Sequence, residues 1–148
     1  TEFPEKYEIF ESFIKVLIKE VTSKNFESQL EFDNWHEDKC KKLLHLFDDN
    51  FDVKTYVGQA QKWINMTLKY LFALGEERID GISRNYYLFH ITIDNIIQDK
   101  LFKEGIPKFK SAWSRIDNYE NYLDYQSAVR EKFKLEIPMD IEFKLFNE

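Results

Sequence analysis

The sequence has few residues that interrupt helices or form covalent cross-links. Among its 148 residues are four glycines, three prolines and a single cysteine, Cys40. One cysteine excludes an internal disulfide framework and is compatible with a reducing compartment. The scarcity of glycine and proline favours long helices with few breaks between them.

Long apolar runs are missing too. No stretch of about 18 apolar residues is present to span a bilayer, and the first residues lack the basic start and apolar core of a secretory signal. We therefore expect a cytoplasmic protein without membrane contact.

The overall charge lacks the basic excess typical of proteins that coat nucleic acid. The formal net charge is −6, which argues against indiscriminate binding of that kind. Residues 1–53 carry 7 basic and 13 acidic side chains, residues 54–116 carry 10 and 6, and residues 117–148 carry 4 and 8. Only the middle is basic, so a nucleic acid would bind there, whereas a basic protein partner would meet the acidic ends.

Aromatic residues are abundant, at 17% of the chain, and its length suits one core without disulfides or metal. We predict a single all-α domain over residues 1–148, a bundle of about six helices. Apolar residues at helical spacing and capping signals predict helices at Pro4–Val21, Asp33–Phe47, 54–75, 94–102 and 117–133, and a helix or a strand from Pro138 onward. We expect a loop at 25–32.

The helix at 54–75 is expected to be the centre of the bundle, because most of its surface is apolar. A regular polar line interrupts that surface, formed by Gln59, Lys62, Asn65 and Lys69 at steps of three and four. The line is expected to face a cleft or the solvent. Alternatively, Gln61 and Asn65 hydrogen-bond inside the core.

Residues 86–93 are apolar and β-branched toward their end, so they fit either an extended segment or a buried helical turn. We favour the extended form. Thr92 or Asp94 is then the N-cap of the following helix, which Gly105 and Pro107 terminate.

Two separated motifs resemble the core of helix-hairpin-helix DNA glycosylases of the oxoguanine type. They are Val57-Gly58 with Lys62, and Ile91-Thr92-Ile93-Asp94. The resemblance implies that the Lys62 amine attacks the sugar carbon and that Asp94 stabilises the developing oxocarbenium ion. A lysine shielded from water is a competent Schiff-base nucleophile. The similarity covers about forty residues, and the glycine-rich hairpin that grips DNA phosphates has no counterpart here.

Both residues also have a purely structural interpretation. Lys62 would extend its stem along the surface with its amine in water, and Asp94 would cap a helix.

The segment Arg84-Asn-Tyr-Tyr-Leu-Phe-His90 resembles the Arg-polar-x(4)-His element of HEPN ribonucleases. That resemblance implies that Arg84 and His90 converge on an RNA phosphate, with His90 transferring a proton and Arg84 stabilising charge. Chance occurrence of the pattern is the alternative.

His36 and Cys40 are four residues apart and share a helix face, which provides two zinc ligands. A third ligand would have to be His45 or His90, and neither spacing matches a structural zinc pattern. We therefore expect no metal and no cofactor, with a half-buried histidine beside an inert cysteine.

Basic and aromatic residues also alternate after residue 99, where they could contact phosphates and stack on bases. The group comprises Lys100, Lys103, Lys108, Lys110 and Arg115 with Phe102, Phe109 and Trp113. An ordinary solvated surface is the alternative.

The leading hypothesis is a nucleic-acid-binding or base-processing protein with a degenerate glycosylase-like core. Its catalytic residues would be Lys62 and Asp94, and its binding residues Gln59, Asn65, Lys69, Arg84 and His90. The alternatives are a HEPN-like ribonuclease, an acidic interaction protein without enzymatic activity, and a small-molecule-binding protein with an aromatic pocket beside the polar line.

Overall fold

The computed structural model describes the backbone of residues 2–147 and the side chains of residues 5–147. Across this part of the chain there are six α-helices, two short 3-10 helices and no β-strand, which confirms the all-α prediction. The elements are α1 (Glu2–Ser23), α2 (Gln29–Phe51), α3 (Val57–Leu74), η1 (Tyr86–Leu88), α4 (Asn95–Phe102), η2 (Trp113–Arg115), α5 (Tyr119–Lys132) and α6 (Pro138–Asn147). None of the helices in residues 2–147 is long and apolar enough to cross a membrane.

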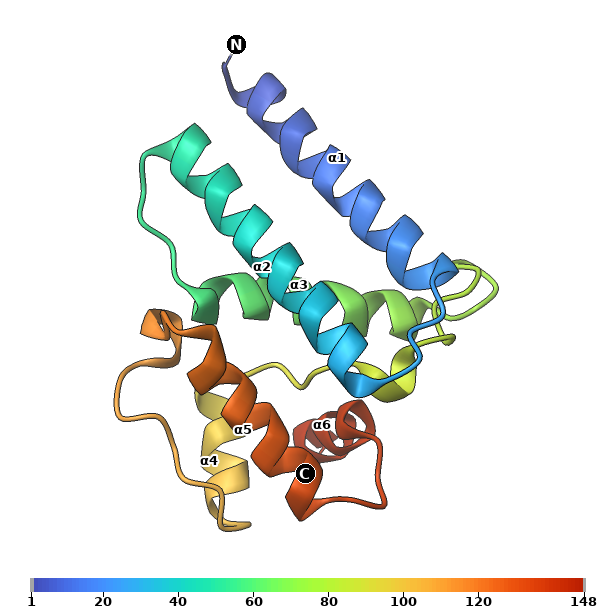
Figure 1. Ribbon diagram of the computed structural model, residues 1–148, viewed down its shortest axis with the longest axis vertical. Helices are drawn as coiled ribbons and strands as arrows, with labels where there is room; N and C mark the ends of the chain where they lie inside the picture. Colours follow the sequence, from blue (N-terminus) through green and yellow to red (C-terminus); the bar gives the residue numbers. More distant parts are fainter. Residues whose placement is uncertain (1, 148) are drawn as a thin grey trace.

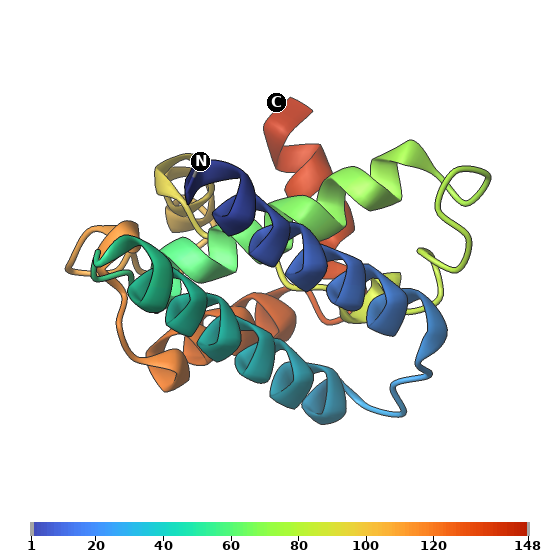
Figure 2. The same ribbon diagram turned by 90° about the horizontal axis from the view of Figure 1, so that it is seen from above.

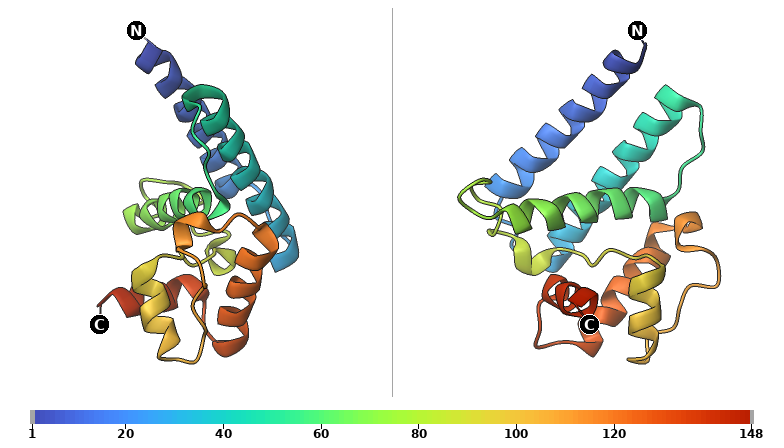
Figure 3. Two further views of the ribbon diagram at one scale, coloured as in Figure 1. Left: turned by 90° about the vertical axis from the view of Figure 1, so that its left-hand side faces the viewer. Right: turned by 180° about the vertical axis from the view of Figure 1, so that it is seen from behind.

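Helices α1 and α2 lie side by side in opposite directions, and α3 crosses them (Figure 1). The shorter helices α4, α5 and α6 gather on the other side of α3, as the two views of Figure 3 show. Helix α3 packs against α2, η2 and α5. It is therefore the central helix that the sequence predicted.

The first two helices, seen side by side from above in Figure 2, pack through apolar residues. Leu17 and Val21 of α1 are fully buried, as are Phe32 and Leu43 of α2. The prediction of a loop over residues 25–32 is wrong at its end, because α2 begins at Gln29. The reason is local: the Ser28 side chain accepts a hydrogen bond from the Glu31 backbone N–H, at 3.1 Å, and so caps the helix five residues before Asp33.

An extended segment, residues 89–93, runs through the core after the 3-10 helix η1. The prediction of an extended segment is thus confirmed for 89–93, and residues 86–88 form a helical turn. Because no neighbouring strand is available, side-chain amides supply the backbone partners. Gln61 of α3 donates to the Ile93 carbonyl at 2.8 Å and accepts from its N–H at 3.1 Å. Gln126 of α5 pairs with Ile91 in the same way, at 2.8 and 3.1 Å.

The remaining helix ends follow capping chemistry, with one shift of register. Asp94 caps α4, since its carboxylate accepts the Ile97 N–H at 2.9 Å. The predicted cap at Asp117 is wrong by one residue, because Asn118 accepts the Asn121 N–H at 3.1 Å and α5 begins at Tyr119. The tail from Pro138 is a helix, which resolves the alternative left open there.

Candidate functional site

The first turn of α3 is in unusually close contact with the segment around η2. A methyl group in place of the Gly58 hydrogen would lie 1.8 Å from the Trp113 carbonyl oxygen, so only glycine fits. The Gly58 N–H also donates to the Ile116 carbonyl at 2.9 Å. This contact brings the Trp113 ring beside the next turn of α3, which carries Lys62.

Lys62 and Asp94, the two catalytic candidates, lie together. The Lys62 amine is 3.6 Å from the Asp94 Oδ2 atom, and it lies over the Trp113 ring, 4.6 Å from the ring centroid. The Lys62 side chain is 37% exposed and that of Asp94 is 11% exposed. Asp94 uses its other oxygen to cap α4. The carboxylate is therefore fixed by the backbone, while the amine is open to solvent.

Two further cations lie over one aromatic ring, that of Tyr56. The Arg115 guanidinium carbon and the Lys54 amine are each 5.3 Å from the Tyr56 ring centroid. Arg115 also donates to the Tyr56 hydroxyl at 3.2 Å. Such pairs keep positive charge against a flat apolar surface. We call the set formed by Lys54, Tyr56, Lys62, Trp113 and Arg115 the cationic-aromatic face.

Two of the four members of the polar line of α3 enter the core. Asn65 and Lys69 are 1% and 8% exposed, so the prediction that the line faces a cleft or solvent is wrong for both. The alternative is confirmed for Gln61 and Asn65, which hydrogen-bond internally. The Lys69 amine lies 2.8 Å from a carboxylate oxygen of Glu142, which is fully buried. Gln59, the first member of the line, is exposed and accepts the Tyr56 N–H at 3.0 Å.

A buried polar network connects α2, α3, the extended segment and α5. Asn65 lies at its centre: its Oδ1 is 2.8 Å from His36 Nε2, and its amide donates to the Tyr122 hydroxyl at 3.0 Å. His90 continues the network, with Nδ1 2.7 Å from the Tyr122 hydroxyl and Nε2 2.6 Å from Asp33 Oδ1. The network ends at Arg130, which donates to both Asp33 oxygens at 3.0 and 2.9 Å.

The protonation states of the network follow from burial. Burial lowers the pKa of both His36 and His90, and it raises the pKa of Tyr122. Burial alone would raise the pKa of Asp33, but hydrogen bonds from His90 and Arg130 lower it to about 2. Neutral His90 then donates from Nε2 to the Asp33 carboxylate and accepts the Tyr122 proton at Nδ1. Every member has a partner, which is the pattern of a network that specifies a core.

Arg84 and His90 hydrogen-bond to different residues and differ in their exposure to solvent. Arg84 is exposed and donates to the Thr22 carbonyl at 3.1 Å and the Asn25 side chain at 2.8 Å. His90 is 1% exposed, and both its ring nitrogens are used inside the network.

His36 and Cys40 are adjacent, with the thiol sulfur 3.7 Å from His36 Nδ1. Both are fully buried, so the expected half-buried histidine is more enclosed than predicted. Burial raises the pKa of the Cys40 thiol. Over the part of the chain that is described, no group of three or more histidine, cysteine or acidic residues has the arrangement of a metal site.

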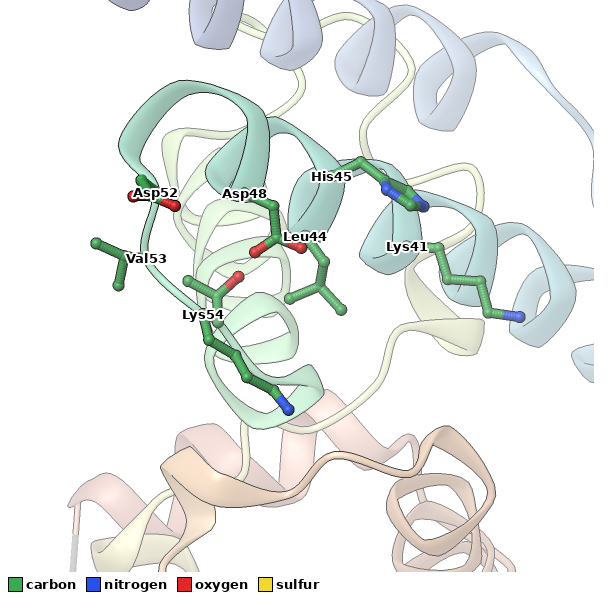
Figure 4. Close-up of a pocket in the computed structure, with 8 residues that line it drawn as sticks. Lys41, Leu44, His45, Asp48, Asp52, Val53 and Lys54 are labelled. Atoms are coloured by element: carbon green, nitrogen blue, oxygen red, sulfur yellow. The ribbon is translucent and has the colours of Figure 1, made fainter.

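A hollow of about 610 Å³ lies where α2 ends (Figure 4). Lys41, His45 and Asp48 of α2 line it, together with Asp52 and Lys54 of the linker that follows. Its charges are of both signs. Because it contains carboxylates, its charge differs from that of the cationic-aromatic face, although Lys54 belongs to both.

Sequence reasoning missed Tyr56 and the roles of Asp33 and Arg130. The sequence predicts Asp33 as the start of a helix, whereas in the structure its carboxylate binds His90 and Arg130. One signal could have indicated this role: if the helix starts before Asp33, the Asp33 carboxylate lies on its apolar side.

Comparisons of the chain with protein families, curated protein sequences and solved structures gave no match.

Proposed function

We propose that the protein binds nucleic acid and processes a base through Lys62 and Asp94. The observation that carries the proposal is the 3.6 Å separation of the Lys62 amine and the Asp94 carboxylate, which are 32 residues apart in the sequence. The amine is within reach of a substrate, and the fixed carboxylate beside it can stabilise positive charge on a sugar. Unlike the shielded lysine expected from the sequence, Lys62 is 37% exposed.

The proposed reaction uses the two groups in different roles. The lone pair of the neutral Lys62 amine bonds to C1′ of a nucleotide, and the glycosidic bond breaks with its electrons leaving on the base, which takes up a proton. Asp94 stabilises the positive charge that develops on the sugar. Loss of a proton from nitrogen and opening of the C1′–O4′ bond, with protonation of O4′, gives an imine that water hydrolyses.

The surroundings of the pair support binding of a phosphate-bearing strand. Lys54 and Arg115 supply positive charge beside Lys62, and the rings of Tyr56 and Trp113 offer flat surfaces on which bases can stack. Neither ring is fully buried.

Reductive trapping tests the proposal. The full chain is incubated at low salt with DNA that carries an abasic or oxidised-base site, in the presence of borohydride, which reduces an imine to a stable covalent adduct. We expect an adduct with the native protein and none with Lys62→Gln. Asp94→Asn should reduce the adduct at least tenfold while retaining the cap, because asparagine also caps helices.

Lys41→Gln is the matched control, since Lys41 is an exposed lysine of α2 paired with Glu37. It should trap like the native protein. If the native protein neither traps nor binds DNA or RNA at low salt, the proposal fails. Equal trapping by the native protein and Lys62→Gln would remove Lys62 as nucleophile.

A non-enzymatic role is the second candidate, favoured by the acidic residues 1–53, which include the whole of α1 and α2. It predicts a basic protein partner whose binding weakens as salt is added. The HEPN-type alternative would need His90 at the RNA phosphate, and His90 is enclosed by the network.

A further inference from the structure

A second hollow, of about 530 Å³, lies between residues 106–111 and one side of α5. This volume falls within the range of small-ligand sites, about 300–1,000 Å³. The loop wall is held in place, because the Phe109 N–H donates to the Gln98 side chain of α4 at 2.9 Å. The loop then continues to Trp113, so one connection carries both the wall of this hollow and part of the cationic-aromatic face.

Stacked aromatic rings form the apolar part of the hollow. The rings of Phe109 and Tyr125 are 5.3 Å apart between centroids, with 25° between their planes. Phe109 is half-buried, so part of its surface faces the opening. A partly exposed ring backed by a second ring is a platform on which a base can stack.

The Tyr125 hydroxyl has no hydrogen-bond partner within the described part of the chain, although its oxygen is buried. The residue is only 6% exposed. A buried hydroxyl without a partner is costly and rare in folded proteins. Burial and the negative charge of Asp94 both raise the pKa of Tyr125, so the phenol keeps its proton and lies within the electrostatic influence of the candidate active site.

The polar groups of the hollow divide by charge. Lys108 and Lys110 line the loop side, and Lys110 has no ion-pair partner among residues 5–147. Asn121 and Asp124 line the helix side and are exposed. The amine suits a phosphate, whereas the amide and carboxylate suit the hydrogen-bonding edge of a base.

We infer that this hollow binds one unpaired nucleotide of a single strand whose neighbouring nucleotides lie on the cationic-aromatic face. The base stacks on Phe109, its edge meets Asn121 and Asp124, and its phosphate contacts Lys110. The buried Tyr125 ring supports Phe109 from behind. This inference rests on the proposed nucleic-acid binding, and it extends that proposal to a subsite outside the reacting pair.

Tyr125→Phe is an internal control, because it removes only a buried hydroxyl that lacks a partner and keeps the ring behind Phe109. We expect the melting temperature to stay the same or rise, since no hydrogen bond is lost. We also expect the affinity for a fluorescein-labelled ten-nucleotide DNA strand, measured by anisotropy at low salt, to stay unchanged, because the hydroxyl oxygen is closed to the hollow.

Two further variants test the platform and the cation. Phe109→Leu should weaken strand binding about tenfold or more, as expected for loss of one stacked base, and Lys110→Gln should weaken it and reduce its salt dependence. Tyr87→Phe and Lys134→Gln are the controls: Tyr87 is exposed on η1, and Lys134 follows α5 outside the hollow. Both should bind like the native protein.

The outcomes separate this inference from the proposed function. If the strand binds but Phe109→Leu and Lys110→Gln both bind it like the native protein, the subsite is refuted and the proposed function stands. If no strand binds to the native protein, both fail. If deoxyadenosine monophosphate binds as tightly as the strand and with the same sensitivity to the variants, the hollow takes free nucleotide and the strand assignment is overturned.

Discussion

Two histidines in the core are the residues whose chemistry depends most on burial. His36 and His90 are at most 1% exposed, and each ring nitrogen lies within hydrogen-bond distance of a neighbour. A proton added to either ring would have to displace one of these bonds in a site closed to solvent. Both rings are therefore neutral in the folded protein near pH 7.

This burial predicts acid sensitivity. The pKa of each histidine lies below its ordinary value of 6.5 in the folded protein and returns toward 6.5 on unfolding. As pH falls below about 6.5, the unfolded state takes up protons that the folded state does not, so the free energy of unfolding decreases by up to about 1.4 kcal/mol per pH unit for each histidine.

Urea unfolding followed by circular dichroism at several pH values between about 7 and 5 measures the effect. His36→Gln should start from a lower stability and lose part of the slope. A stability that stays constant over this pH interval in the native protein would contradict the neutral, buried assignment.

Single residues also show where sequence reasoning ends. The spacing of Gln61 and Asn65 on an apolar helix admitted an internal role for both, and the structure confirms it. Asp94 could be recognised as a cap from its place before an apolar helix. Its distance from Lys62 could not be predicted, because helical periodicity does not say how two helices 20 residues apart cross.

At the scale of elements, α1 was predictable because its apolar residues from Phe10 to Val21 follow helical spacing over about three turns. The start of α2 was not, since Ser28 and Asp33 are both good caps and only tertiary structure decides between them. The position of η2 was beyond prediction, because it depends on a backbone contact with Gly58, more than 50 residues earlier.

That contact makes Gly58→Ala a test of how α3 and η2 position the site. The added methyl group would meet the Trp113 carbonyl, so the two segments must separate. Overpacking of this kind costs about 1–3 kcal/mol. We expect a lower melting temperature and an altered tryptophan emission, together with weaker nucleic-acid binding.

Gly75→Ala is the comparison. No atom lies within 4 Å of the added methyl, and the cost arises only from a positive φ of 91°. It should lower stability by about 1 kcal/mol and leave nucleic-acid binding unchanged. Equal loss of nucleic-acid binding in both variants would show that the Gly58 contact does not position the site.

At the scale of the whole molecule, charge is separated along the chain. The acidic helices α1 and α2 lie side by side (Figure 1), and the basic middle contributes the cationic-aromatic face on the α2–α3 linker, α3 and η2. The sequence predicted this segregation from charge counts. It could not predict that the basic middle includes a buried lysine, Lys69, which adds nothing to the surface.

The segregation predicts a strong salt dependence of nucleic-acid binding. Contacts with three or four phosphates of a single strand would weaken binding about 20- to 50-fold between 50 and 200 mM salt. Anisotropy titrations with a labelled strand at several salt concentrations measure the slope. Affinity that does not change with salt would show that phosphate contacts contribute little.

The pairing of Gln61 and Gln126 with the extended segment also bears on how the chain folds. The segment obtains its backbone hydrogen bonds from two helices that lie 32 and 35 residues away, one before it and one after it. Neither helix alone satisfies every backbone group of Ile91 and Ile93: Asn65 of α3 also donates to the Ile91 carbonyl at 3.1 Å, but the Ile91 N–H depends on Gln126. A chain that ends before α5 would therefore leave the buried Ile91 N–H without its partner, and closing both loops is expected to complete this part of the core.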